Sequence, residues 1–228
     1  MRKEKLGAVG CSSGGDDYNH CCLSCFSKKA EQYIHAATKS VPYVAYKNKF
    51  MTTDNKRIWI ETGYSIFAAS GQAGLKVEPL AQAVGKSKSS FYHHFADMDL
   101  FMDYLLQHHL KQSAIIGQKE NSASCVDPEL ISILVEHQTD LLFNRHLRIH
   151  RNISSFNTAL QQSDKIVGNA FVKVWAKEMN LNMPAHKIES ITTLALENFY
   201  LQINENNINH KWLSSYFAEL KKITTSLL

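Results

Sequence analysis

The sequence predicts an all-α protein, with an N-terminal three-helix domain that contains a helix-turn-helix and a larger helical domain after it. From Asp54 onward, apolar residues recur at intervals of three and four, which is typical of helices with one buried face. No segment shows the alternation of apolar and polar residues that indicates a strand. We therefore divide the chain into a leader over 1–50, a helix-turn-helix domain over 51–100 and a helical domain over 101–228.

The leader has neither helical nor strand periodicity and mixes Gly, Ser and Asp, so we expect little stable structure there. It holds eight Lys or Arg and four Asp or Glu, and thus the whole net charge of +4. Met51 opens a plausible natural start, so the leader is expected to be disordered or non-native. The alternative is a basic arm that follows the phosphates of a nucleic acid.

The cysteines favour neither a disulfide framework nor a metal site. Four of the five lie in the first 25 residues, and only Cys125 lies beyond them. Cys22 and Cys25 have the spacing of a zinc-binding pair, but a structural zinc site needs a second pair or two spaced histidines. We expect unpaired thiols, no metal ion and no cofactor.

The first two helices are predicted from caps and apolar faces. The first runs from an Asp54 N-cap to Gly71, with its apolar residues on one side. The second is short and fits 77–84. Pro79 is tolerated there because the N–H groups of a first helical turn have no partner within the helix.

A third short helix follows at once. Gly85 ends the second helix, and Ser87 is expected to cap the third, which continues to about His94. Phe91 and Phe95 have helical spacing with the apolar residues before them, so we assign them to the core. Two short helices around a Gly-containing turn predict a helix-turn-helix.

The rest of the chain is predicted to be helical. Asp97 is expected to cap a long helix that ends near Gly117, followed by a loop over 121–125. Asp127 and Pro128 have the residue types of an N-cap and a first helical position, and that helix is expected to end near residue 144. Further helical patterns cover 146–161, 163–180, 184–204 and 209–227.

Residues 80–95, which read LAQAVGKSKSSFYHHF, resemble the DNA-binding signature of the tetracycline-repressor (TetR) family. Small and apolar residues before the Gly, the Ser-Lys pair after it, and aromatic residues at Tyr92 and Phe95 stand where that family has them. The resemblance covers about 57–106, and beyond it only length and helical content agree. It implies a one-component bacterial transcriptional repressor whose helical domain dimerises and senses a small molecule, but it does not identify that molecule.

Three positions depart from the family pattern. Lys76 stands where the family usually has Thr as the cap of the second helix, so the cap is lost or supplied by the backbone. Ser89 replaces the commoner Gly where the recognition helix comes closest to DNA. Met98 replaces a typical Lys, which is expected to remove one contact with the DNA backbone. These departures leave open an alternative: a ligand-binding or interaction protein with the TetR fold and weakened or lost operator binding.

In a helix-turn-helix the second helix lies in the major groove, while flanking groups contact phosphates. Lysines supply positive charge here, and the resemblance implies backbone contacts from Tyr92 and His94. We expect base reading chiefly from Lys88 and His93, although His93 and His94 could instead be a solvated pair. The predicted DNA-binding residues are Lys76, Lys86, Ser87, Lys88, Ser89, Ser90, Tyr92, His93 and His94.

One such helix pair buries too little surface for tight specific binding, so we expect a homodimer on a palindromic double-stranded operator. The last two helices are the most apolar candidates for its interface, and they could also belong to the core of one chain. The residues expected at the interface are Ile188, Ile191, Leu194, Ala195, Phe199, Trp212, Tyr216, Leu220, Ile223 and Leu227.

A basic stretch at 145–151 lies near aromatic residues, which suggests a pocket for an anionic or aromatic effector. The candidate ligand-binding residues are Phe143, Arg148, Phe156 and Phe171. The alternative, which we prefer, is a solvated helix face or a set of structural ion pairs.

Other classes of protein have little support. The sequence lacks a Gly-rich phosphate loop and a nucleophile elbow, and Cys125 has no nearby base, so we expect no catalytic residues and no enzyme. No run reaches the roughly 18 apolar residues of a membrane span, and the start lacks the apolar stretch of a secretory signal. We therefore expect a cytoplasmic protein.

Overall fold

The computed structural model describes residues 50–178 and 184–226. Within these ranges every regular element is helical and no strand occurs, so the predicted all-α class is confirmed. The predictions for the leader and for Leu227 lie outside the described residues, apart from Phe50, which begins the first helix. No helix in these ranges combines the length and hydrophobicity needed to cross a bilayer.

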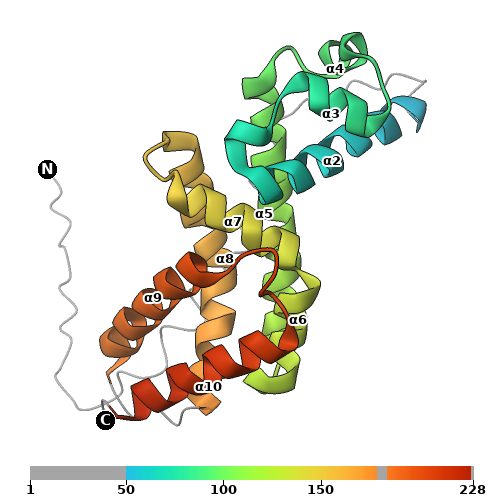
Figure 1. Cartoon of the computed structure of the whole chain (residues 1–228). Coiled ribbons are helices and arrows are strands. Elements are labelled where there is room, and N and C mark those ends of the chain that lie inside the picture. Colours follow the sequence, from blue (N-terminus) through green and yellow to red (C-terminus); the bar gives the residue numbers. More distant parts are fainter. Residues whose placement is uncertain (1–49, 179–183, 227–228) are drawn as a thin grey trace, which may run out of the picture. The chain divides into compact units, whose positions relative to one another are not determined.

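The helix-turn-helix has the predicted helices. Its elements are α2 (Phe50–Gly74), α3 (Val77–Val84) and α4 (Lys88–His94) (Figure 1). α2 begins at Phe50, so Asp54 lies inside the helix and the prediction that it is the N-cap is wrong; the helix also continues three residues beyond Gly71. The backbone does leave the helical path at Gly71, where φ is 65°, so the sequence located the break but not the extra turn after it.

The short helices are held by the expected turn chemistry. Gly85, after α3, has a φ of 69°, a left-handed conformation that favours glycine. The Oγ of Ser87 accepts a hydrogen bond from the backbone N–H of Ser90 at 3.2 Å, which confirms the predicted cap. Lys76 makes no side-chain cap to α3, and the helix forms without one.

Aromatic packing fixes α4 from behind. Phe91 and Phe95 are fully buried, as predicted from their spacing. The ring of Phe91 makes edge contacts with Trp59 of α2 (5.6 Å between centroids) and Phe101 of the next helix (5.3 Å). Because both neighbours lie on longer helices, the orientation of α4 about its own axis is determined.

α5 (Met98–Ser122) extends from the helix-turn-helix to the helices that follow it, within the one compact unit formed by residues 49–228 (Figure 1). The carboxylate of Asp97 caps it by accepting from the N–H of Leu100 at 2.7 Å, as predicted. The predicted end near Gly117 is wrong by five residues. Gly117 is not a stop signal but a point of close packing, because a Cβ there would lie 2.9 Å from the backbone oxygen of Ile166.

The segment predicted as one helix over 127–144 is divided. It forms a π-type turn, η1 (Val126–Leu130), then α6 (Ile131–Glu136) and α7 (Gln138–Ile149). The break falls at His137, whose side chain is held by polar contacts described below. These tertiary contacts, rather than a Gly or Pro, interrupt the helix, so the local sequence gave no signal.

The helices predicted over 146–161 and 163–180 have the wrong bounds. α7 continues to Ile149, the chain turns over 150–153, and α8 (Ser154–Glu178) then runs unbroken where the two helices were expected to be separate. α9 (Ala185–Gln202) and α10 (His210–Ser226) lie within two residues of the predicted bounds. α5 and α8 pack closely along their lengths, and α9 and α10 lie at the end of the domain away from α4 (Figure 1).

Candidate functional site

The outer face of α4 presents polar side chains. Lys88, Ser89, Tyr92 and His93 are exposed, with 56% of Tyr92 accessible to solvent, while Ser90 and His94 are partly buried. Lys76, Lys86 and Ser87 are exposed on the segments that lead into α3 and α4. The structure therefore brings all nine predicted DNA-binding residues to the two short helices and their turns, with none in the core.

The charges on this surface are only loosely engaged. The Nζ of Lys88 lies 3.0 Å from Oε1 of Glu78 on α3, and both side chains are more than half exposed. An exposed pair of this kind contributes about 0–1 kcal/mol, so Lys88 can exchange it for another anion at little cost. Burial, then the neighbouring charges of His93, Lys56 and Lys86, lower the pKa of His94, so His94 adds no positive charge near neutral pH.

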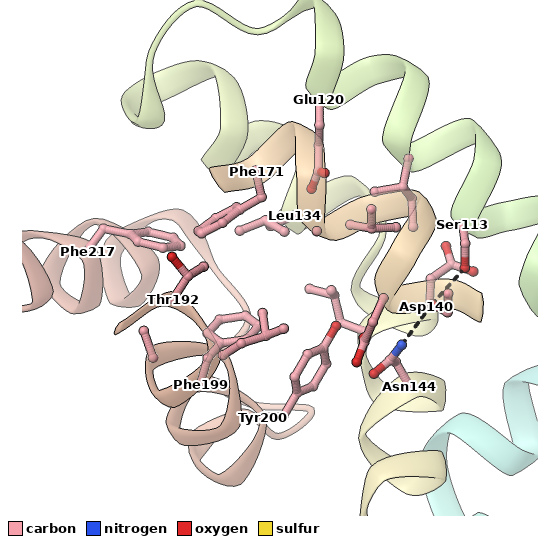
Figure 2. A pocket seen from close by; sticks show the side chains of 18 of the residues that line it. Ser113, Glu120, Leu134, Asp140, Asn144, Phe171, Thr192, Phe199, Tyr200 and Phe217 are labelled. Atoms are coloured by element: carbon pink, nitrogen blue, oxygen red, sulfur yellow. Dashed lines mark hydrogen bonds between the residues drawn. The ribbon is translucent and has the colours of Figure 1, made fainter. Parts of the chain in front are cut away.

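A second feature is a cavity of about 70 Å³ in the helical domain, lined by residues from α5 to α10 (Figure 2). This is several times the roughly 10–15 Å³ that one water molecule needs. Among the four candidate ligand-binding residues, only Phe171 lines it. The sequence offered no direct signal for the cavity, because its lining comes from helices far apart in the chain.

The other three candidates have different surroundings. Phe143 and Phe156 are buried against Phe67 of α2, with ring centroids 4.4 and 5.7 Å away. Arg148 makes ion pairs with Asp164 (2.8 Å) and Glu197 (2.5 Å), which agrees with the structural ion pairs offered as the alternative for this stretch. The four residues therefore do not surround one space.

A buried hydrogen-bond network joins α2 to the cavity wall. The hydroxyl of Tyr64 donates to Oδ1 of Asp140 at 2.7 Å and lies 2.8 Å from Nδ1 of His109. Burial lowers the pKa of His109 to about 3, so this imidazole is neutral. Since the Tyr64 proton points to Asp140, Nδ1 of His109 must carry the hydrogen and donate to Tyr64.

The network continues through amide and hydroxyl groups. Nδ2 of Asn144 donates to Nε2 of His109 at 3.4 Å and to Oγ of Ser163 at 3.0 Å, which suits the tautomer just assigned. The hydroxyl of Ser113 donates to the backbone oxygen of His109, so Ser163 donates to Ser113 across 3.1 Å. The donors and acceptors of these hydrogen bonds are therefore all consistent with one another, and the network links α5, α7 and α8.

His137 completes the network at the break between α6 and α7. Lys119 can only donate, so Nε2 of His137 accepts from its Nζ at 3.0 Å. Nδ1 of His137 then donates to Oδ2 of Asp140 at 2.9 Å. Asp140 is thus satisfied on both carboxylate oxygens. Sequence reasoning missed Tyr64, His109, His137 and Asp140, because they are scattered over 77 positions of the chain.

The predicted interface residues divide into two groups. Phe199 is buried, and Tyr216 donates from its hydroxyl to the backbone oxygen of Ala195 at 2.9 Å, so these residues also pack within the chain. Of the predicted residues, Leu194 (72%) on α9 and Ile223 (51%) on α10 are left exposed. Leu201 on α9, which was not predicted, is exposed as well (73%). The others are partly buried: Ile188, Ile191, Ala195, Trp212 and Leu220.

Comparison with known proteins gives a consistent fold. No profile of a protein family matches the chain. A curated relative, the uncharacterized HTH-type transcriptional regulator YwcC of Bacillus subtilis (strain 168), is 24% identical over 172 residues, which cover 73% of this chain and 67% of that protein.

Two solved structures are similar at 12% identity and a TM-score of 0.52. One is a transcriptional regulator from Rhodococcus sp. Rha1, matched over 74% of this chain and 94% of that one. The other is a putative TetR-family transcriptional regulator from Mesorhizobium loti MAFF303099, matched over 78% and 98%. The chain therefore has the all-α fold of TetR-family transcriptional regulators.

Proposed function

We propose that the chain is a transcriptional regulator that binds a palindromic operator as a homodimer and is released from it by a small-molecule effector. The observation that carries this proposal is the outer face of α4, where Lys88, Ser89, Tyr92 and His93 are exposed while Phe91 anchors the helix from behind. A rigid helix with such a face fits the major groove, where each base pair presents a distinct pattern of donors and acceptors.

Phosphate contacts come from the flanking groups. Lys76 and Lys86 are exposed at the two ends of α3, and Lys88 opens α4. Each phosphate that a lysine neutralises adds roughly 0.9 to the salt slope of binding, so this patch supports a moderate salt dependence. The Bacillus subtilis relative is named as an HTH-type transcriptional regulator, which agrees with this role.

The exposed apolar residues on α9 and α10 support a dimer. Leu194 and Leu201 are seven residues apart, which puts them on the same side of α9. Side chains of this size are each worth about 1.5–3 kcal/mol when fully buried, so a second copy packed against this side would be stabilised by them. A two-fold dimer presents two copies of α4 to half-sites about one helical turn apart.

The cavity supports the proposal that a small-molecule effector releases the protein from its operator. It shares Asp140, His109 and Asn144 with the hydrogen-bond network that begins at Tyr64 of α2. A ligand that displaces one of these groups would change the support of α2, and hence the position of α4. Such a ligand favours release only to the extent that it binds one conformation better than the other.

The decisive experiment is selection of genomic DNA fragments on the purified full chain. The proposal predicts recovery of fragments with a short palindrome, bound more tightly than random duplex of equal length. Binding no better than to random duplex by a folded dimer would overturn the proposal and favour a ligand-binding protein that has lost its operator. Lys76 without a side-chain cap and Met98 at the start of α5 motivate that rival.

A further inference from the structure

Glu120 on α5 is a buried acid without a partner. Only 1% of the residue is exposed, and neither carboxylate oxygen has a hydrogen-bond partner among the described residues. Its carboxyl group points into the cavity (Figure 2). Burying an unpaired carboxylate is costly, so native proteins rarely keep one without a use for it.

The other carboxylates of the cavity wall are already engaged. Asp164 is paired with Arg148 at 2.8 Å, and Asp140 accepts from Tyr64 and His137. Among the described residues that line the cavity there is neither Lys nor Arg. Glu120 is therefore the acid that remains for a ligand, and no cationic side chain among the described lining residues would pair with an anion.

Aromatic rings line the cavity beside Glu120 and opposite it (Figure 2). Phe171 and Phe217 are 5.7 Å apart between centroids, and Phe199 and Tyr200 lie below them, with the hydroxyl of Tyr200 directed into the space (Figure 2). The faces of such rings attract cations and accept apolar groups equally well. The wall thus offers one acidic group and an aromatic surface beside it and opposite it.

We propose that this cavity binds a small organic cation, with an ammonium group on the Glu120 carboxylate and an apolar or aromatic body against Phe171, Phe199 and Phe217. That this cation is the effector rests on the proposed function. It replaces the anionic effector considered for the basic stretch at 145–151, where Arg148 is occupied by Asp164 and Glu197.

Binding would be coupled to release of a proton. Burial raises the pKa of Glu120 to about 8, so the empty cavity holds a neutral carboxylic acid near pH 7. An arriving ammonium ion displaces that proton to solvent and forms an ion pair with the carboxylate. Affinity should therefore rise about tenfold per pH unit from about 6 to 8, while an alkylamine stays protonated.

The other titratable groups that face Glu120 are not expected to cause this pH dependence of affinity. Burial raises the pKa of Tyr216 on α10 to about 12 and raises that of Tyr200 on α9 further, so both stay neutral in this window. His109 on α5 stays neutral too, with a pKa of about 3. Asp140 on α7 accepts from Tyr64 and His137, and Asp164 on α8 is paired with Arg148, while burial raises the pKa of Asp164. Lys173 and Lys177 on α8 line a second pocket, which Glu120 also lines.

The test is calorimetry on the full chain with three probes of similar size and different charge: 2-phenylethylammonium, 2-phenylethanol and phenylacetate. The proposal predicts that the ammonium ion binds at least about tenfold more tightly than the alcohol, with phenylacetate weakest. Buffers of different ionisation enthalpy should report release of close to one proton near pH 7. Glu120→Gln keeps the shape of the side chain, and it should reduce binding of the ammonium ion to that of the alcohol and remove the pH dependence.

Glu219→Gln is the matched control, because Glu219 is exposed on α10, pairs with Lys222 and does not line the cavity. It should leave all three affinities unchanged. Equal binding of alcohol and ammonium ion, tighter binding of phenylacetate, or no binding of the ammonium ion would each overturn the assignment. The pH dependence of the unaltered chain tests it even if the Gln variant does not fold. Selection of DNA fragments is independent of these titrations, so failure of the two proposals can be told apart.

Discussion

The hydroxyl of Tyr64 lies 2.7 Å from Oδ1 of Asp140, and this hydrogen bond connects α2 of the helix-turn-helix to the wall of the cavity. Tyr64 belongs to α2, whose Trp59 packs on Phe91 of α4. Asp140 belongs to α7 and lines the cavity. A change at Asp140 therefore has a short physical route to α4, through one hydrogen bond and one aromatic contact.

Replacing Tyr64 with Phe should remove the hydrogen bond to Asp140 without leaving a cavity in the core. The ring can still stack on Phe143, at 4.3 Å between centroids, but Asp140 and His109 each lose a partner. Leaving buried groups unpaired costs about 1–3 kcal/mol, so the free energy of unfolding should fall by that amount in urea denaturation. Tyr92→Phe is the control, because the Tyr92 ring is exposed and its change should stay within about 0.5 kcal/mol. Equal effects of the two substitutions would contradict the role given to Tyr64.

Two helical glycines should respond in opposite ways to substitution by Ala. A Cβ at Gly117 of α5 would lie 2.9 Å from the backbone oxygen of Ile166 on α8, which cannot move without shifting the helix. At Gly168 of α8 a Cβ meets nothing within 4 Å. Gly168→Ala should therefore raise the free energy of unfolding by up to about 1 kcal/mol, and Gly117→Ala should lower it by about 1–3 kcal/mol. Thermal denaturation distinguishes the two, and stabilisation by both would show that α5 and α8 are not in close contact at Gly117.

The buried acid also predicts how stability depends on pH. The pKa of Glu120 rises from its ordinary value of 4.5 to about 8 on folding, so the folded chain binds the proton more tightly than the unfolded chain. Its contribution to stability is complete below about pH 4.5 and is lost as the pH rises through about 8. Glu120→Gln removes this loss, so the variant should gain more than about 1 kcal/mol relative to the unaltered chain between about pH 5 and pH 9. Denaturant titrations at both pH values measure the change, with Glu219→Gln as the control. A constant difference would mean that Glu120 is hydrated in solution.

The exposed leucines of α9 predict the oligomeric state. Leu194→Glu puts a charge where we expect the second copy to pack, so sedimentation should show a shift from dimer to monomer at concentrations where the unaltered chain is dimeric. Ile115→Glu, on an exposed position of α5, should leave the dimer intact. If both variants remain dimeric, the interface lies elsewhere on the chain.

The sequence predicted best those features that depend on neighbouring residues. The Ser87 and Asp97 caps and the bounds of α3 and α4 follow from local hydrogen bonding, and they were found where expected. Gly117 was misread as a stop because a glycine at a close helix contact and one at a helix end look alike in sequence. The break at His137 was missed because its cause lies in other helices.

The candidate site was predictable on α4 and not in the cavity. Helical spacing alone predicted that Phe91 is buried and that Lys88 and His93 are exposed, since all three residues lie on one short helix. Glu120 gave no signal, because an acid in an amphipathic helix is usually solvated. Its burial comes from helices that pack against α5 in the folded chain, above all α8, and no pattern in a single sequence reports that packing.

We propose that α4 reads the base sequence of DNA while the lysines beside it bind phosphates. Selection of base preference, on the operator recovered from genomic DNA, would test this for the unaltered chain, Lys86→Ala and His93→Ala. We expect Lys86→Ala to weaken binding about uniformly across sequences and to lower the salt slope by about 1. His93→Ala should change the preferred base at one position of each half-site, at a cost of about 1–3 kcal/mol for the original operator. If His93→Ala leaves the base preference unchanged and no other exposed residue of α4 alters it, α4 is not the reading helix.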